Sequence, residues 1–153
     1  MDADGTHTAP PHGPRIVVEL YCSDFRRSLA FYTEVLGFAV RYARLEERFA
    51  YLDLAGAELM IEQTVEPSRT LLAADLARPF GRGVNLQIDV DDVDAIHARV
   101  RAAGTTVFRP LEERRYGTND GEVCVRQFVA MDPDGYLLRF AQDLTTPSSV
   151  PPA

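Results

Sequence analysis

The stretch SDFRRSLAFYTEVLGF, residues 23–38, has the pattern of a helix with both ends marked in the sequence. Ser23 or Asp24 is a residue type that caps helix N-termini, and Gly37 is the type that ends helices. Between them, apolar residues recur at the spacing of one helix face: Phe25, Leu29, Tyr32 and Leu36. The pattern predicts a helix that begins after the cap, ends at Gly37 and buries one face.

The sequence on both sides of this helix predicts strands. The run RIVVELYC precedes the helix at 15–22 and has the apolar character of a buried strand. Three further strand-like runs follow the helix, at 38–44, 48–55 and 57–63, with a turn at Ala55-Gly56 between the last two. The order is one strand, one helix and three strands, a unit that we call a module.

The second half of the chain repeats this order. The run VNLQIDV at 84–90 predicts a strand, and Asp91 or Asp92 caps a helix that Gly104 ends. On that helix Val93, Ile96, Val100 and Ala103 share one face, and further strands are expected at about 105–115, 122–131 and 135–142. The tetrapeptide LEER occurs at 45–48 and again at 111–114, at equivalent places in the two modules. The chain is therefore expected to be α+β, with two paired βαβββ modules.

The predicted folded domain spans residues 14–143. Its modules occupy 15–63 and 82–143, and a polar, proline-containing linker joins them at 64–81. We expect disordered tails at 1–13 and 144–153. One module alone would leave a sheet face bare, so two modules are expected to roll their strands into a cup, with helices covering the outside.

Composition excludes several classes of function. The 153 residues carry a net charge of −7, which argues against nucleic acid or an anionic membrane surface as the main partner. No apolar stretch approaches the roughly 20 residues of a membrane span, and the N-terminus lacks a signal-peptide core. The two cysteines, Cys22 and Cys124, are expected to be free thiols, so a cytoplasmic location is predicted.

Three motifs carry a resemblance to a known family. Residues 23–38, the segment GVNLQIDVDDVDAIHARVRAAG at 83–104 and the segment DPDGYLLRF at 132–140 resemble the vicinal oxygen chelate superfamily. This superfamily includes glyoxalase I, extradiol dioxygenases, fosfomycin resistance proteins and bleomycin resistance proteins. The resemblance covers about 15–143 and implies paired βαβββ modules that form a curved mixed sheet, the cup, which holds the site.

Enzymes of this superfamily usually hold a divalent metal ion in the cup. The resemblance places the four ligand positions at Val17, Glu62, Asn85 and Arg139. Only Glu62 is an ordinary ligand, because valine has no donor atom and the guanidinium of arginine offers no lone pair. None of the three histidines is expected on a strand that faces the cup. We therefore expect a metal-independent protein with no cofactor.

Strand alternation predicts which side chains face the cup. We expect Glu62 and Arg139 to form an ion pair there, either within one chain or across a dimer interface. The full set of candidate ligand-binding residues is Glu19, Tyr21, Phe49, Tyr51, Glu58, Met60, Glu62, Asn85, Gln87, Tyr116, Arg126 and Arg139.

The residues that would convert binding into catalysis are not apparent in the sequence. Neither cysteine has an expected histidine partner, and no Gly-x-Ser-x-Gly motif is present. The resemblance therefore favours a homodimer that sequesters a cationic, partly aromatic ligand, as bleomycin resistance proteins do. A lyase, isomerase or dioxygenase of the same superfamily is the alternative, and a regulatory or immunity role cannot be separated from sequestration by sequence.

Overall fold

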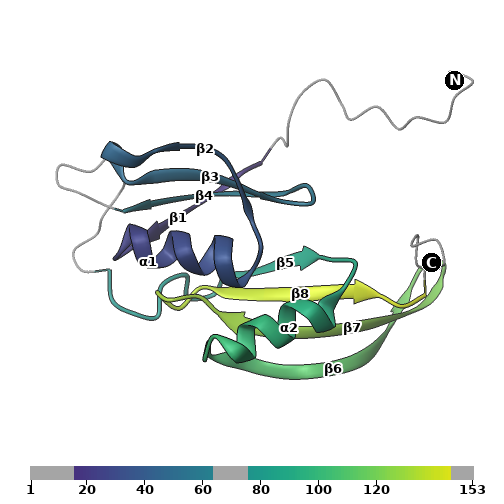
Figure 1. The fold of residues 1–153 in the computed structure, drawn as a ribbon. Coiled ribbons are helices and arrows are strands. Elements are labelled where there is room, and N and C mark those ends of the chain that lie inside the picture. Colours follow the sequence, from purple (N-terminus) through teal and green to yellow (C-terminus); the bar gives the residue numbers. More distant parts are fainter. Residues whose placement is uncertain (1–15, 64–75, 146–153) are drawn as a thin grey trace, which may run out of the picture.

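The computed structural model describes residues 16–63 and 76–145. The expected tail at 1–13, residues 146–153 of the expected tail at 144–153 and residues 64–75 of the expected linker at 64–81 lie outside the described residues. Within the described part, Figure 1 shows two modules that each contain a four-stranded sheet and a helical segment. The predicted α+β fold class with paired βαβββ modules is confirmed.

Each module follows the order that the sequence predicts. The first contains β1 (Val18–Cys22), α1 (Phe25–Ala30) continued by a π-helical segment η1 (Phe31–Val35), β2 (Ala39–Arg44), a 3₁₀ turn η2 (Leu45–Glu47), β3 (Phe49–Leu54) and β4 (Ala57–Gln63). The second contains β5 (Asn85–Asp89), α2 (Val93–Ala102), β6 (Val107–Thr118), β7 (Gly121–Met131) and β8 (Leu137–Asp143). Within the described ranges, no helix has the length and apolar character needed to cross a membrane.

The helix ends form as their sequence signals predict. The Asp24 carboxylate accepts a hydrogen bond from the backbone N–H of Arg27 at 3.1 Å, and Asp92 accepts one from Ala95 at 3.0 Å. These bonds satisfy backbone donors that the first helical turn leaves free. Beyond the helical segment of the first module, Gly37 has a φ of 89°, a conformation that glycine adopts at low cost.

The strands form two separate sheets. Their orders are β1-β4-β3-β2 and β5-β8-β7-β6. The pairs β1–β4 and β5–β8 are parallel and the other pairs are antiparallel, so both sheets are mixed. No strand pairing in the described ranges joins one sheet to the other.

The helix-covered faces of the two sheets share one hydrophobic core. Leu20 and Ile61 of the first sheet and Phe128 and Phe140 of the second belong to the same buried cluster. Figure 1 shows α1 between the first sheet and the second module, and α2 over the second sheet. Each sheet therefore keeps one uncovered face that points away from this core. We call these the first open face (β1–β4) and the second open face (β5–β8).

This arrangement differs from the expectation that the strands of one chain roll into a cup with helices outside. The helical segment of each module carries an apolar face. When the two modules pack through these faces, both faces are buried in the same core. As a result, the two open faces do not face each other within one chain.

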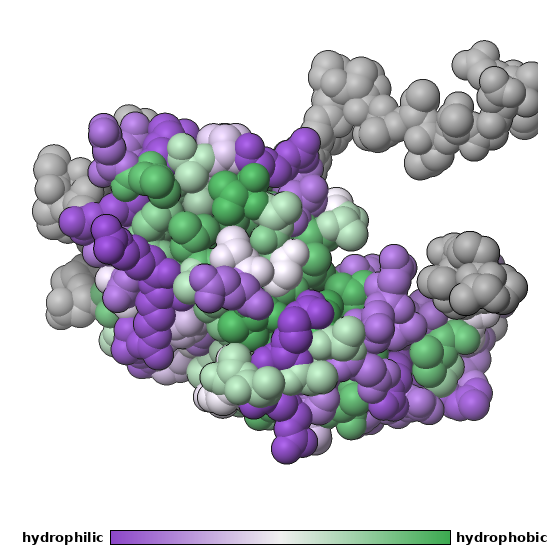
Figure 2. All heavy atoms as spheres, viewed as in Figure 1, coloured by the Kyte–Doolittle hydropathy of each residue, from purple (hydrophilic) through white to green (hydrophobic). Residues whose placement is uncertain are grey.

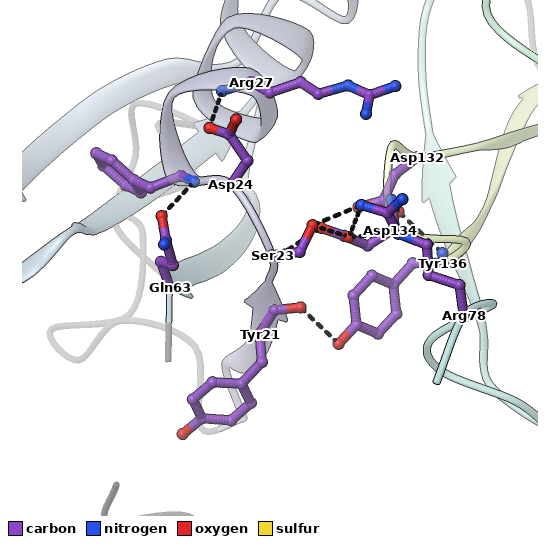
Figure 3. Close-up of polar contacts among 10 residues, drawn as sticks. Tyr21, Ser23, Asp24, Arg27, Gln63, Arg78, Asp132, Asp134 and Tyr136 are labelled. Carbon is purple, nitrogen blue, oxygen red and sulfur yellow. Dashed lines mark hydrogen bonds and ion pairs between the residues drawn. The ribbon is translucent and has the colours of Figure 1, made fainter. Parts of the chain in front are cut away.

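The turn at 132–135 joins the modules. The Asp134 carboxylate, 1% exposed, accepts hydrogen bonds from the Ser23 backbone N–H at 2.9 Å, the Ser23 hydroxyl at 2.6 Å and Arg78 Nε at 3.1 Å. Figure 3 shows Ser23 and Arg78 converging on Asp134. Nearby, the Tyr32 hydroxyl donates to Asp132 at 2.9 Å and the Tyr136 hydroxyl donates to the Tyr21 carbonyl at 2.9 Å. These bonds fix the direction in which each open face points.

Candidate functional site

The first open face carries the side chains that strand alternation predicts. Leu20, Leu59 and Ile61 are buried in the shared core, so the residues that alternate with them lie on the uncovered side. In the sheet register, Glu62 lies opposite both Tyr21 on β1 and Phe49 on β3. The predicted residues on this face are Glu19, Tyr21, Phe49, Tyr51, Glu58, Met60 and Glu62.

Two carboxyl groups meet on this face. The side chains of Glu19 and Glu62 are hydrogen-bonded to each other. Partial burial, followed by this hydrogen bond and by the charge of Glu62, raises the pKa of Glu19 above its ordinary value. Two carboxyl groups so close together concentrate negative charge on this face when both are ionised.

The Glu19–Glu62 pair predicts a pH-dependent effect on stability. Because the pKa of Glu19 is raised in the folded state, Glu19 favours folding fully below its unfolded pKa, and this contribution is lost as pH rises through the folded pKa. A Glu19→Gln variant cannot ionise, so we expect a higher Tm than the native chain at pH 7. The difference should shrink as pH falls below the ordinary glutamate pKa. Thermal unfolding followed by circular dichroism from pH 3.5 to 7.5 measures this, and a difference that grows toward low pH would contradict it.

Aromatic rings form a continuous row beside the carboxyl pair. The Tyr42 ring stacks on Tyr51 with centroids 5.2 Å apart and lies 5.9 Å from the Phe49 ring. The Arg44 guanidinium lies 3.9 Å from the Phe49 centroid. Phe49 is only 3% exposed, whereas Tyr42 is 49% exposed. The aromatic surface that this face offers to solvent is therefore chiefly Tyr42, which the sequence-predicted set does not contain.

Glu58 is already neutralised within the chain. Arg41 NH1 lies 2.6 Å from a Glu58 carboxylate oxygen, and the Tyr51 hydroxyl donates to the other oxygen. That hydrogen bond raises the pKa of Tyr51 to about 12. Glu58, one of the candidate ligand-binding residues, therefore adds little to the negative charge of this face, because its charge is paired with Arg41. Among the candidate residues of the first open face, Glu19 and Glu62 are the carboxyl groups without a cationic partner in the described ion pairs.

The second open face carries a different set of polar groups. Gln87 lies opposite Arg139 in the parallel pair β5–β8, and its amide donates to Asp89 at 3.0 Å. Asn85 is exposed on the same strand face. Tyr116 accepts a 2.8 Å hydrogen bond from Gln127, which is 7% exposed and absent from the sequence-predicted set. No period-two signal identifies Gln127, because residues 127–130 are all buried.

Arg126 does not lie on the open face. Its Nε and NH2 atoms donate to the two carboxylate oxygens of Asp94 on α2, at 2.9 and 2.8 Å. A third contact joins it to Glu113 at 3.3 Å. Arg126 therefore shares the helix-covered side of β7 with Phe128 and pairs with the start of α2. This placement removes it from the candidate binding residues.

Glu62 and Arg139 do not pair within one chain. Glu62 belongs to the first sheet and Arg139 to the second, and no ion pair joins the two in the described residues. The partner that Glu62 has is Glu19. The intrachain form of the predicted ion pair is thus wrong, because the two open faces point in different directions.

The four family metal positions do not fit a metal ion. Val17 and Glu62 belong to the first module, and Asn85 and Arg139 to the second. Even if the two open faces were brought together, the set would supply one carboxylate and one amide oxygen beside a permanent cation. In the described residues, no group of three or more histidine, cysteine, aspartate or glutamate side chains is arranged to hold a metal ion.

Two surface cavities lie away from both open faces. One, of about 580 Å³, is bordered by α1, the Arg78-Pro79 segment and the 131–135 turn. The other, also about 580 Å³, lies between α2 and the start of β6, beside His97 and Arg101. Neither is lined by any of the twelve sequence-predicted site residues. The predicted residues therefore lie outside these two cavities.

Comparison with known proteins places this geometry in a family. The model of the Glyoxalase/Bleomycin resistance protein/Dioxygenase superfamily matches residues 14–140. A protein of Vibrio parahaemolyticus described as a probable lactoylglutathione lyase is 30% identical over 132 residues, which cover 81% of this chain and 86% of the relative.

Solved structures show the same similarity. The crystal structure of TioX from Micromonospora sp. ML1 is 29% identical, with coverage of 86% of this chain and 100% of that one and a TM-score of 0.60. A protein of unknown function from Agrobacterium tumefaciens is 24% identical, with coverage of 87% and 97% and a TM-score of 0.63, which shows the fold alone. With the two βαβββ modules and the family match over most of its length, the chain belongs to the glyoxalase/bleomycin resistance protein/dioxygenase superfamily.

Proposed function

We propose that the protein binds a cationic, partly aromatic small molecule of the bleomycin type and releases it unchanged. The observation that carries the proposal is the Glu19–Glu62 carboxyl pair beside the row of aromatic rings on the first open face. Paired carboxyl groups attract a cation, and exposed ring faces bind planar or cationic groups by stacking. The donor set at the family metal positions does not support metal-assisted chemistry.

The site is proposed to form across a homodimer. Within one chain the open faces point apart, so a closed cup requires the first open face of one copy and the second open face of another. Glu62 on the first face and Arg139 on the second would supply a pair of opposite charges across such an interface. Figure 2 shows hydrophobic residues gathered on the first module. Exposed Tyr42 on β2 and Tyr116 on β6 would gain cover in such an assembly.

Isothermal titration calorimetry with a metal-free bleomycin-type ligand tests the proposed function. We expect saturable binding that weakens as salt concentration rises, because part of the attraction is between exposed charges. Glu19→Gln and Glu62→Gln should each weaken binding by about three- to tenfold, by loss of one charge contact. The matched control is Glu122→Gln, an exposed glutamate on the β6–β7 hairpin that pairs with Arg115. Equal weakening by all three variants would show that net charge, and not this face, controls binding.

An enzyme of the same superfamily is the second candidate. The observation in its favour is the 30% identity to the probable lactoylglutathione lyase of Vibrio parahaemolyticus. In that case the chain would convert a small-molecule substrate without the usual metal donors, and Glu62 is the residue placed to act as a general base. Turnover of a hemithioacetal of glutathione by the purified chain would favour this candidate over binding alone.

A further inference from the structure

Phe49 is buried although it lies on an uncovered sheet face. Its ring is 3% exposed, and the side chains that cover it come from the neighbouring strand β2: the Arg44 guanidinium at 3.9 Å from the ring centroid and the Tyr42 ring at 5.9 Å. Arg44 lies directly opposite Phe49 in the register, and Glu62 lies opposite Phe49 on its other side. A cation from the chain itself therefore occupies a ring face that adjoins the carboxyl pair.

The contacts that hold Arg44 in place are exposed. Its Nε donates to Glu47 at 2.6 Å, in an ion pair whose side chains are 47% and 64% exposed. Exposed pairs of this kind contribute little stability, because water and salt compete for both partners. The charge of Arg44 also acts on the Glu19 carboxyl. Arg44 thus lies against an aromatic ring that adjoins the acidic pair, and its ion pair with Glu47 is exposed to solvent.

We propose that Phe49, Glu19 and Glu62 form a guanidinium-binding subsite that Arg44 fills in the free protein, and that a ligand cation displaces Arg44 from it. This inference rests on the proposed function, since it concerns the same open face, and it defines the ligand group more narrowly. A planar guanidinium or amidinium stacks on a ring and donates hydrogen bonds to a carboxylate at its edge, whereas a neutral group of the same shape lacks the charge. Arg44 is then a specificity-determining residue that competes with the ligand.

Titration with methylguanidinium, followed by NMR, tests the subsite without the natural ligand. The variants are Arg44→Ala and Arg44→Gln, with Arg115→Ala as the control, because Arg115 is also an exposed arginine in an ion pair but lies on the β6–β7 hairpin. We expect both Arg44 variants to bind methylguanidinium about two- to fivefold more tightly than the native chain. The shifts should centre on the Phe49 ring and the Glu19 and Glu62 carboxyl carbons. Methylurea, the neutral analogue, should bind neither form.

The outcomes separate the subsite from the proposed function. Unchanged affinity in both folded Arg44 variants, an equal gain in Arg115→Ala, or binding of methylurea at the same level would overturn the subsite. If the Arg44 variants bind methylguanidinium as expected but the native chain binds no bleomycin-type ligand, the subsite stands and the proposed function fails. Dispersed amide spectra of each variant establish that the comparison is made between folded proteins.

Discussion

Replacing Asp134 by alanine is expected to lower the free energy of unfolding by about 3 kcal/mol. Each hydrogen bond to a buried carboxylate contributes roughly 1.5–3 kcal/mol, and water that enters the space left by the carboxylate recovers part of this loss. The carboxylate is almost completely buried and accepts two hydrogen bonds from Ser23 and one from Arg78. All three donors lie in other parts of the fold, so the substitution removes a connection between the modules and not only a turn contact. Urea unfolding at neutral pH measures the loss.

Asp120→Ala is the matched control for this experiment. Asp120 also lies in a turn between two strands, but it is exposed, and an exposed substitution of this kind changes stability by less than about 0.5 kcal/mol. If Asp134→Ala unfolds at the same urea concentration as Asp120→Ala, the junction does not hold the modules together. A larger loss accompanied by a lower m-value would indicate that the modules unfold separately.

Reversing the charge of Glu62 or Arg139 is expected to weaken self-association by about 100-fold or more, because like charges placed against each other at an interface cost several kcal/mol. In the proposed homodimer, Glu62 of one copy meets Arg139 of the second copy twice, once in each cup. Glu62→Arg brings two arginines together, and Arg139→Glu brings two glutamates together. Sedimentation equilibrium over a range of protein concentrations measures the dissociation constant.

The doubly substituted chain, Glu62→Arg with Arg139→Glu, provides the decisive comparison. It restores opposite charges across the interface with the partners exchanged, so it should recover most of the native affinity. Because the two residues lie on different sheets of one chain and do not pair there, rescue can only arise between copies. A monomer mass for the native protein, or a double variant no better than the single ones, would contradict the proposed dimer.

The helices and strands could be predicted from the sequence because the residues that mark them lie close together along the chain. A capping aspartate, apolar residues three and four positions apart and a closing glycine lie within one segment, and the two helices begin and end where these residues stand. The alternation in β1, β4, β5 and β8 is also local, and it separates buried from uncovered side chains in all four strands. Those strands supplied most of the candidate residues that lie on the open faces, and β3 and β6 supplied Phe49, Tyr51 and Tyr116.

The candidate residues that were misplaced or missed lie where alternation is interrupted. Arg126 precedes Phe128 by two positions and shares its side of β7, but residues 127–130 do not alternate in burial, so the sequence does not show which side of this strand the helix covers. Tyr42 and Arg44 lie on β2 beyond an irregularity in its pairing between Val40 and Tyr42, which shifts the register. In β7 and β2, the packing of neighbouring residues, and not the alternation in the sequence, determines which side chains are exposed.

The relative placement of the two sheets could not be read from the pattern either. It depends on contacts between residues more than 90 positions apart, such as Tyr32 with Asp132 and Ser23 with Asp134. The sequence identifies 132–135 as a turn, but nothing local shows that its two carboxylates accept hydrogen bonds from the first module. In place of the expected single-chain cup, the described residues form two open faces, which a second copy closes in the proposed homodimer.

Native mass spectrometry of the metal-stripped protein with a bleomycin-type ligand tests the central claim of binding without conversion most directly. The account predicts a dimer that carries two ligands with no divalent metal ion, and ligand of unchanged mass after recovery from the complex. A dimer that stays free of ligand at high micromolar concentration, or a recovered ligand whose mass has changed, would contradict it.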